Sequence, residues 1–216
     1  MRVPVIGVTG PIASGKTTVA RLMAGDCGAL IDCDELGARA LEAADVRKKL
    51  VAAFGARILD PRGKVSRPRL ARLVFASDRD IDRLNRIVRP RLKRIITDEV
   101  LRRRAEAPYI VLDAVLLFQY KFRFKVDFTV ATRASGASRL ARIMRRDGIS
   151  RAEAVARIER QRGLEGGWAK ADVVIATDGP LARVRSEVGR IRERFLAKRQ
   201  ANRRKARWKR NSRTGR

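Results

Sequence analysis

The sequence has no histidine and only two cysteines, which excludes several kinds of catalytic and metal site. Without an imidazole, neither a Ser-His-Asp triad nor a Cys-His pair nor a histidine-bound metal ion is available. Cys27 and Cys33 are too few for a disulfide framework or a four-ligand zinc site, and we interpret them as small core residues. Chemistry in this chain therefore depends on Asp, Glu, Lys and Arg side chains or on backbone groups.

Long apolar runs and acidic residues are also scarce. No apolar run exceeds five residues, which excludes a membrane-spanning helix of about 20 residues. The N-terminus begins with a strand pattern and carries no leader pattern, so we expect a cytoplasmic protein. The 51 Lys and Arg outnumber the 23 Asp and Glu and give a net charge of +28, which suits a polyanionic substrate.

Short apolar segments alternate along the chain with segments of helical spacing. The strand-type segments are residues 3–8, 29–34, 109–113, 126–131 and 172–176. The segments with helical spacing are residues 16–24, 35–41, 46–54, 67–75, 81–104, 135–146, 150–162 and 180–198. The alternation predicts an α/β fold in which a parallel sheet carries helices on both faces.

The charge distribution and the helical segments suggest a division of the chain. Residues 1–196 are predicted to form a single domain, with a helical substrate-binding insertion at about 35–106 and a lid at about 135–165. Residues 197–216 contain ten Lys and Arg and no acid, and we expect them to be disordered or a frayed helix. Such a tail is either a solvated end or a weak electrostatic contact for nucleic acid.

The segment GPIASGKT at residues 10–17 matches the pattern G-x-x-x-x-G-K-[ST], with a strand before it and a helix after it. Glycines permit the tight turn that points successive N–H groups at nucleotide phosphates. Lys16 supplies a charge near the β- and γ-phosphates, and Thr17 supplies a hydroxyl for Mg²⁺. The predicted ATP-binding residues of this segment are Gly10, Pro11, Ile12, Ala13, Ser14, Gly15, Lys16, Thr17 and Thr18.

Three carboxylates follow apolar strand-type segments. Asp32 and Asp34 end the second segment, where both can face a Mg²⁺–nucleotide site from one side of a strand. Asp34 is interpreted as a base that orients a substrate hydroxyl, although it also fits the N-cap of the next helix. Asp113 ends the IVLD segment and is either a second Mg²⁺-binding carboxylate or an ordinary strand end.

Arg139, Arg142 and Arg146 share one face of a predicted helix. Guanidinium groups on such a face can neutralise the charge that develops on a transferring phosphoryl group. A solvated basic face explains the same spacing, so both interpretations remain open.

Several of these segments, in order, resemble the dephospho-CoA kinase family. The matching segments are VTGPIASGKT at 8–17, IDCD at 31–34 followed by Ala38 and Arg39, FGARIL at 54–59, Arg67 with Leu70, Val74 and Phe75, VLDAVLLF at 111–118, Arg142 with Arg146, Asp147 and Gly148, Gln161, and Ala171 with Asp172. The resemblance covers roughly residues 3–190 and implies ATP-dependent phosphorylation of the ribose 3′-hydroxyl of dephospho-CoA. It also implies a P-loop core with a helical coenzyme A domain and a lid.

The resemblance implies a role for each matching residue. Asp34 would accept the proton of the hydroxyl, and Lys16, Arg142 and Arg146 would act with it in catalysis. Mg²⁺ would be held by Thr17, Asp32 and Asp113, and Thr177 would lie near the adenine of ATP. The acceptor side would include Arg39, Arg67, Arg89, Leu116, Gln119 and Gln161 together with Asp34.

Five positions depart from the family pattern: Ala13 replaces a loop glycine, Arg89 a histidine, Val115 a proline, Gln119 a glutamate and Thr177 an asparagine. Several of these changes fall on the acceptor side, so the acceptor is less firmly implied than ATP. The alternatives are another nucleoside or nucleotide kinase of this fold, or a non-catalytic relative that binds nucleic acid through the basic tail.

Overall fold

We describe a computed structural model of the chain. It describes residues 2–74, 77–161 and 170–211, with side chains up to residue 201. Within this part of the chain, five parallel strands form one sheet in the order β2-β3-β1-β4-β5. The strands are β1 (Val5–Thr9), β2 (Ala29–Asp32), β3 (Ile110–Asp113), β4 (Phe128–Arg133) and β5 (Val173–Ala176). The predicted α/β class is confirmed.

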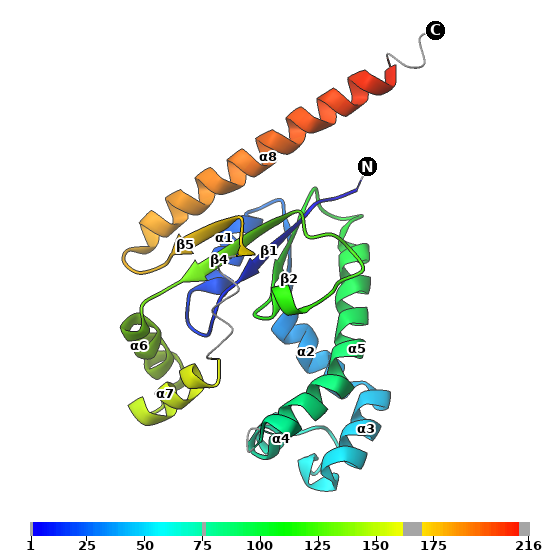
Figure 1. The fold of residues 1–216 in the computed structure, drawn as a ribbon, viewed down its shortest axis with the longest axis vertical. Coiled ribbons are helices and arrows are strands. Elements are labelled where there is room, and N and C mark those ends of the chain that lie inside the picture. The colour runs from blue at the N-terminus through cyan, green and yellow to red at the C-terminus, as the bar shows by residue number, and fades with distance from the viewer. Residues whose placement is uncertain (1, 75–76, 162–169, 212–216) are drawn as a thin grey trace.

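Helices cover both faces of this sheet (Figure 1). Along the interior strand β3, Ile110 and Leu112 pack into the cluster with α2 and α5, and Val111 packs into the cluster with α1 and α8. This period of two is what a strand buried on both faces requires. The covering helices are α1 (Lys16–Ala24), α2 (Cys33–Glu42), α5 (Asp78–Arg103) and α8 (Leu181–Asn211).

Part of the segment predicted as an insertion (35–106) forms a helical lobe with its own small core, while α2 and the C-terminal half of α5 pack on the sheet. The lobe contains α3 (Ala44–Phe54), the short η1 (Ala56–Ile58), α4 (Arg67–Val74) and the N-terminal half of α5. The side chains of Val46, Leu50 and Ile58 are almost completely buried in this core, which is distinct from the two apolar clusters on the faces of the sheet. The lobe is therefore packed around its own apolar side chains, with the N-terminal half of α5 as one of its walls.

A helical pair follows β4 where the lid was predicted. The pair consists of α6 (Gly136–Asp147) and α7 (Arg151–Glu159). Earlier in the chain, the short η2 (Leu117–Gln119) lies between β3 and β4. The side chains of Ser135 and Ser150 cap the two N-termini, and Ser150 forms a reciprocal capping box with Glu153. The part of the predicted lid beyond Gln161, up to residue 165, lies outside the described residues.

Three local predictions were wrong. The second strand ends at Asp32 instead of Asp34, because the Asp32 carboxylate caps α2 and the helix starts at Cys33. The last helix continues past Lys198 to Asn211, since no glycine or proline lies between Gly189 and Asn211 and the segment is rich in strong helix formers. The predicted boundary at residue 197 therefore falls inside α8. Cys33 is buried as expected, but Cys27 is exposed.

Among the described residues, no helix combines the length and the apolar character that crossing a bilayer demands.

The middle of α8 is attached to the rest of the protein by Arg199. This residue donates to Asp127 Oδ1 at 3.3 Å and to the carbonyl of Arg2 at 3.3 Å. Beyond that anchor α8 projects away from the other elements (Figure 1).

Candidate active site

The phosphate loop, residues 10–17, connects β1 to α1 at the carboxyl end of the sheet. Gly15 has φ of 82° and leads into α1, whose N-terminus has no side-chain cap. Gly10 has φ of 152°, and a Cβ there would overlap the side chains of Thr132 and Ser14. Uncapped N–H groups together with the helix dipole make this end of α1 a site for anionic phosphate.

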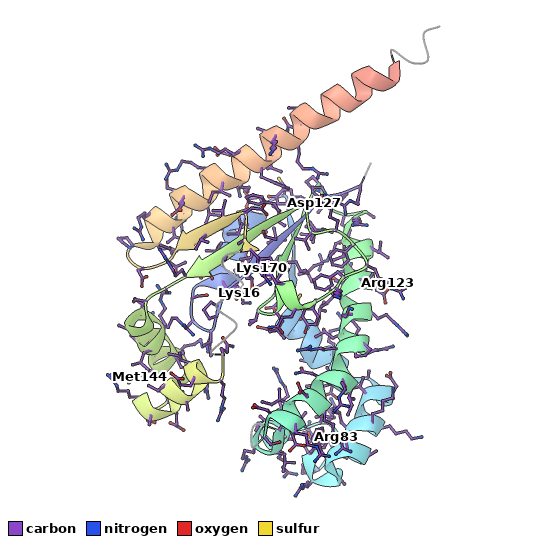
Figure 2. All side chains as sticks on the ribbon, in the orientation of Figure 1. Lys16, Arg83, Arg123, Asp127, Met144 and Lys170 are labelled. Atoms are coloured by element: carbon purple, nitrogen blue, oxygen red, sulfur yellow. The ribbon has the colours of Figure 1, made fainter. Side chains whose placement is uncertain are left out.

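A cavity of about 680 Å³ lies against this loop. Its walls are Pro11, Ile12, Ala13, Gly15, Lys16, Thr17, Thr18, Asp34, Val115, Arg142, Arg145, Arg146 and Gln161. Lys16, labelled in Figure 2, is only 8% exposed, so its charge is directed into the site and not toward bulk water. We refer to this space as the nucleotide cavity.

Asp113 joins the phosphate loop to the sheet. Parallel register places it beside Val8 of β1 and Asp32 of β2, and its side chain is completely buried. The Lys16 ammonium donates to Asp113 Oδ1, and Thr17 Oγ1 donates to Asp113 Oδ2 at 2.8 Å. A buried carboxylate needs such partners, and here it connects the two side chains that the motif places at the phosphates.

The oxygen atoms of Thr17 and Asp113 fit Mg²⁺. A hydroxyl and a carboxylate are hard donors, and Mg²⁺ is normally held by one or two protein oxygens together with nucleotide phosphates and water. The described residues contain no group of three or more Cys, Asp and Glu that would form a complete protein cage. Asp32 is placed differently from the prediction, because its Oδ1 accepts from the N–H groups of Asp34 (2.8 Å) and Glu35 (3.2 Å).

Asp34 stands in the first turn of α2, and the prediction that it shares a strand face with Asp32 is wrong. The alternative that Asp34 is the N-cap is also wrong, because Asp32 has that role. The Asp34 side chain is 67% exposed, and its Oδ2 lies 3.9 Å from Lys16 Nζ. The surrounding protein displaces water from the Asp34 carboxyl and thereby raises its pKa, whereas the positive charge of Lys16 lowers that pKa.

A second cavity of about 340 Å³ adjoins the first, and we call it the acceptor cavity. Its walls are Cys33, Asp34, Gly37, Leu41, Arg67, Leu84, Asn85, Val88, Arg89, Leu92, Ala114, Val115, Leu116 and Tyr120. Asp34 and Val115 line both cavities, so they stand where the two spaces meet. A carboxylate at that junction can contact groups held on either side.

Four of the residues predicted for the acceptor side, Asp34, Arg67, Arg89 and Leu116, do line the acceptor cavity. Arg39 and Gln119 are exposed and do not line it.

Sequence reasoning missed Asn85, Val88 and Tyr120, three lining residues. Their only signal in the sequence was helical spacing with Arg89 or closeness to the LLF segment. Burial raises the pKa of Tyr120, so its phenol stays protonated and remains a hydrogen-bond donor.

The remaining predicted residues gather around the phosphate loop. Gln161 Oε1 accepts from the Ile12 N–H at 2.6 Å, so Gln161 lies at the nucleotide cavity instead of the acceptor side. Thr177, only 5% exposed, donates to the Ser14 carbonyl at 2.7 Å and lines a cavity of about 320 Å³ beside Gly15 and Gly179. Thr177 therefore lies beneath the loop.

The two lid arginines differ in their contacts. Arg142 donates to the Ala13 carbonyl and to both oxygens of Thr177. Arg146 has a side chain that is 59% exposed, lines the nucleotide cavity and pairs with Asp147 at 2.7 Å. Arg146 is thus placed to reach a ligand from the lid, whereas the Arg142 guanidinium is bound to the backbone of the loop.

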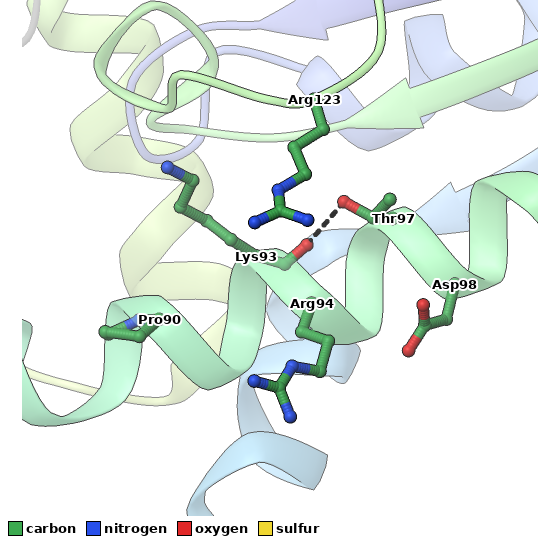
Figure 3. A pocket seen from close by; sticks show the side chains of 6 residues that line it. All are labelled: Pro90, Lys93, Arg94, Thr97, Asp98 and Arg123. Atoms are coloured by element: carbon green, nitrogen blue, oxygen red, sulfur yellow. Dashed lines mark hydrogen bonds between the residues drawn. The ribbon is translucent and has the colours of Figure 1, made fainter.

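A further hollow of about 350 Å³ lies along α5 and shares no lining residue with the acceptor cavity (Figure 3). The side chains of Lys93, Arg94 and Arg123 bring positive charge to this hollow. The Thr97 hydroxyl donates a hydrogen bond to the Lys93 carbonyl at 2.7 Å. None of the predicted site residues lines it. The candidate site is therefore the pair of cavities that Asp34 joins.

These features define a P-loop kinase: a phosphate loop at the carboxyl end of a parallel sheet, a second cavity across a carboxylate, and a lid. A family model described as dephospho-CoA kinase matches residues 4–183. The dephospho-CoA kinase of Arabidopsis thaliana is 38% identical over 179 residues, 82% of this chain and 77% of the relative. That of Moorella thermoacetica is 38% identical over 188 residues, 85% and 88% of the two chains.

Solved structures agree with the fold. The crystal structure of TT1252 from Thermus thermophilus superimposes with a TM-score of 0.74 at 32% identity, over 92% of this chain and 98% of that one. Dephospho-CoA kinase from Campylobacter jejuni has a TM-score of 0.57 at 21% identity, over 88% and 96% of the two chains, and supports the fold alone. The chain belongs to the dephospho-CoA kinase family, and it is therefore a phosphotransferase that uses ATP.

Proposed function

We propose that this chain transfers the γ-phosphoryl group of ATP to the ribose 3′-hydroxyl of dephospho-CoA, with Asp34 as the residue that orients that hydroxyl. The observation that carries the proposal is the position of Asp34 at the junction of the nucleotide and acceptor cavities. A hydroxyl held beside Asp34 from the acceptor side faces the phosphates held by the loop. Positioning of this kind is the main requirement for phosphoryl transfer.

In the proposed step the 3′-oxygen forms a bond to the γ-phosphorus, and the bond between that phosphorus and the β,γ-bridging oxygen breaks. ADP leaves with the bridging oxygen, and the hydroxyl proton passes to the Asp34 carboxylate and then to water. Lys16, 3.9 Å from Asp34, keeps that carboxylate ionised and places positive charge beside the phosphates. Arg146 adds charge from the lid.

The acceptor cavity suits an anionic ligand. Neither Arg67 nor Arg89 forms an ion pair within 4 Å with a described acidic side chain, and Arg89 Nε is buried with no hydrogen-bond acceptor among the described residues. A buried donor without a partner costs free energy that a ligand phosphate would recover. The diphosphate of dephospho-CoA offers such oxygens, so we assign Arg67 and Arg89 to it.

Mg²⁺ would be held by Thr17 and Asp113, whose oxygen atoms fit it. When bound, the ion neutralises charge on the triphosphate. Because Asp113 already accepts hydrogen bonds from Lys16 and Thr17, this residue fixes the positions of both side chains next to the phosphates.

The decisive experiment replaces Asp34 and measures coenzyme A production by mass from ATP, Mg²⁺ and dephospho-CoA. Asp34→Asn is expected to lower kcat by about 10³-fold with ADP affinity nearly unchanged, since the amide cannot accept the proton. The matched control is Glu35→Gln, which removes a charge from the same turn of α2 but from an exposed side chain outside both cavities. Full activity in Asp34→Asn would refute the proposed role.

The basic composition of the end of α8 favours a second, weaker function. The helix continues to Asn211, and residues 197–216 contain ten Lys and Arg without an acid. We infer an electrostatic contact with nucleic acid, which predicts RNA binding that falls steeply with salt and is lost when residues 200–216 are deleted. RNA affinity equal in the full and shortened chains would exclude this contact.

The cytoplasmic location expected from the sequence stays a prediction.

A further inference from the structure

Three successive carbonyl groups of the phosphate loop accept hydrogen bonds from side chains that belong to other segments of the chain. The Ile12 carbonyl accepts from Arg139 Nε at 3.0 Å, and the Ala13 carbonyl accepts from Arg142 Nη1 at 3.1 Å. The Ser14 carbonyl accepts from Thr177 Oγ1 at 2.7 Å. We call Arg139, Arg142 and Thr177 the carbonyl clamp.

The direction of these carbonyls decides where the loop's N–H groups point. In a trans peptide unit the C=O and the following N–H point to opposite sides of the chain. Because the Ile12 and Ser14 carbonyls are turned toward the carbonyl clamp, the N–H groups of Ala13 and Gly15, two residues that line the nucleotide cavity, are turned away from the clamp. The Ser14 N–H closes a turn on the Pro11 carbonyl at 3.2 Å, while the N–H groups of Ala13 and Gly15 have no acceptor among the described residues.

Ala13 makes this arrangement costly. Its φ is 59°, and it is the one non-glycine residue with positive φ in the described part of the chain. A side chain with a Cβ is disfavoured in this left-handed conformation, whereas glycine adopts it freely. The conformation persists only where surrounding contacts outweigh its cost.

Arg142 supplies contacts of the required kind. Besides the Ala13 carbonyl, its guanidinium donates to Thr177 Oγ1 at 3.1 Å and to the Thr177 carbonyl at 2.6 Å. One planar group therefore joins α6, the loop and the segment after β5, and a lysine ammonium could not reproduce its fixed fork. Gln161 adds a contact at the neighbouring peptide, where it accepts from the Ile12 N–H.

We propose that Arg142 is a positioning residue that, with Thr177, holds Ala13 in its left-handed conformation and so pre-forms the N–H cradle for nucleotide phosphates. The proposal deepens the proposed function, from which it takes only the binding of a nucleotide at the loop. It differs from the sequence-based role, in which Arg142 closes over the transferring phosphoryl group. The two roles predict different results for a nucleotide that does not react.

The test is a double-mutant cycle in the full-length protein, with ADP affinity measured by calorimetry in the absence of dephospho-CoA. Arg142→Ala and Arg142→Lys are each expected to weaken ADP binding on the order of ten-fold, because the clamp contact is lost in both. Ala13→Gly is expected to change the affinity little by itself. Combined with Arg142→Ala it restores at least about three-fold of the loss, because glycine needs no clamp.

A second variant and a matched control keep the result interpretable. Thr177→Val removes the hydroxyl that donates to Ser14 and is expected to behave like Arg142→Ala in the cycle with Ala13→Gly. Arg145→Ala removes the same charge from the same helix, but Arg145 has no hydrogen bond to the loop. Any effect of Arg145→Ala on ADP affinity should therefore be independent of Ala13.

Two outcomes would overturn the proposal: unchanged ADP affinity in Arg142→Ala, or an Ala13→Gly effect of equal size in the presence and absence of Arg142. A loss confined to kcat would return Arg142 to the reacting phosphoryl group. Because the cycle needs no acceptor, it stands apart from the proposed function. Failure of the wild-type chain to form coenzyme A would refute the acceptor and leave the clamp result valid.

Discussion

The nucleotide cavity and the acceptor cavity meet at Asp34 but are built in different ways. On the nucleotide side, backbone carbonyls of the loop are bound by side chains, and Lys16 and Asp113 are buried against each other. On the acceptor side, Arg67 and Arg89 form no ion pair within 4 Å among the described residues. The nucleotide side is therefore held in shape by hydrogen bonds within the protein and offers backbone N–H groups to its ligand, whereas the acceptor side offers guanidinium groups.

The largest expected effect breaks the nucleotide side. Lys16→Met should lower kcat/KM by about 10³-fold, since a positive charge at the phosphates is lost. It should also destabilise the fold by about 3 kcal/mol, because the Asp113 carboxylate stays buried without its ion-pair partner. Activity assays and thermal unfolding measure the two losses.

A double variant separates these two losses. Lys16→Met with Asp113→Asn removes both buried charges and is expected to recover most of the stability but none of the activity. If the double variant is no more stable than Lys16→Met alone, the buried pair is not what links the loop to the sheet.

A smaller effect is expected on the acceptor side. Arg89→Ala should raise KM for dephospho-CoA by about ten-fold and leave KM for ATP unchanged, because the cost falls on one charge-assisted contact. Arg86→Ala is the control, since Arg86 is an exposed arginine on the same helix that lines neither cavity. Equal effects on both substrates would remove the distinction between the two cavities.

The smallest effect is a shift in pH dependence at the junction. The surrounding protein raises the pKa of Asp34, and Arg67 is among the charges that lower it. Because Asp34 must be ionised to accept the proton, activity falls as pH drops through this raised pKa. Arg67→Gln removes a positive charge, raises the pKa further and should move the acidic limb of log kcat to higher pH. A limb unmoved by this change, or one lying at the ordinary aspartate pKa, would contradict the assignment.

The fold and the nucleotide side could be predicted well from the sequence because their signals are local. A strand, a glycine-rich turn with Lys16 and Thr17, and a helix form one continuous segment, and all five predicted strands are present with end shifts of one or two residues. The predicted end of the second strand at Asp34 was wrong because the Asp32 side chain caps α2 and ends the strand there, and apolar periodicity does not report such a cap.

The acceptor side could be predicted only in part. Its lining comes from α2, α4, α5 and the segment after β3, so residues such as Asn85 and Tyr120 meet only after packing. Gln161 was assigned to the wrong cavity for the same reason, since its distance along the chain from the loop hides a hydrogen bond to Ile12. A sequence motif predicts which residue type occupies a position, whereas the packing of the helices decides which other residues that position contacts.

By itself the sequence determined an α/β kinase with a phosphate loop, a lysine charge near the phosphates and a carboxylate near the acceptor, because each depends on residues close together in the chain. Only the tertiary structure decided that Asp32 caps a helix, that Asp34 joins two cavities and that Arg142 binds the loop backbone. Those roles depend on which hydrogen-bond acceptors packing brings within about 3 Å, and the reach of a side chain is not encoded in its spacing along the chain.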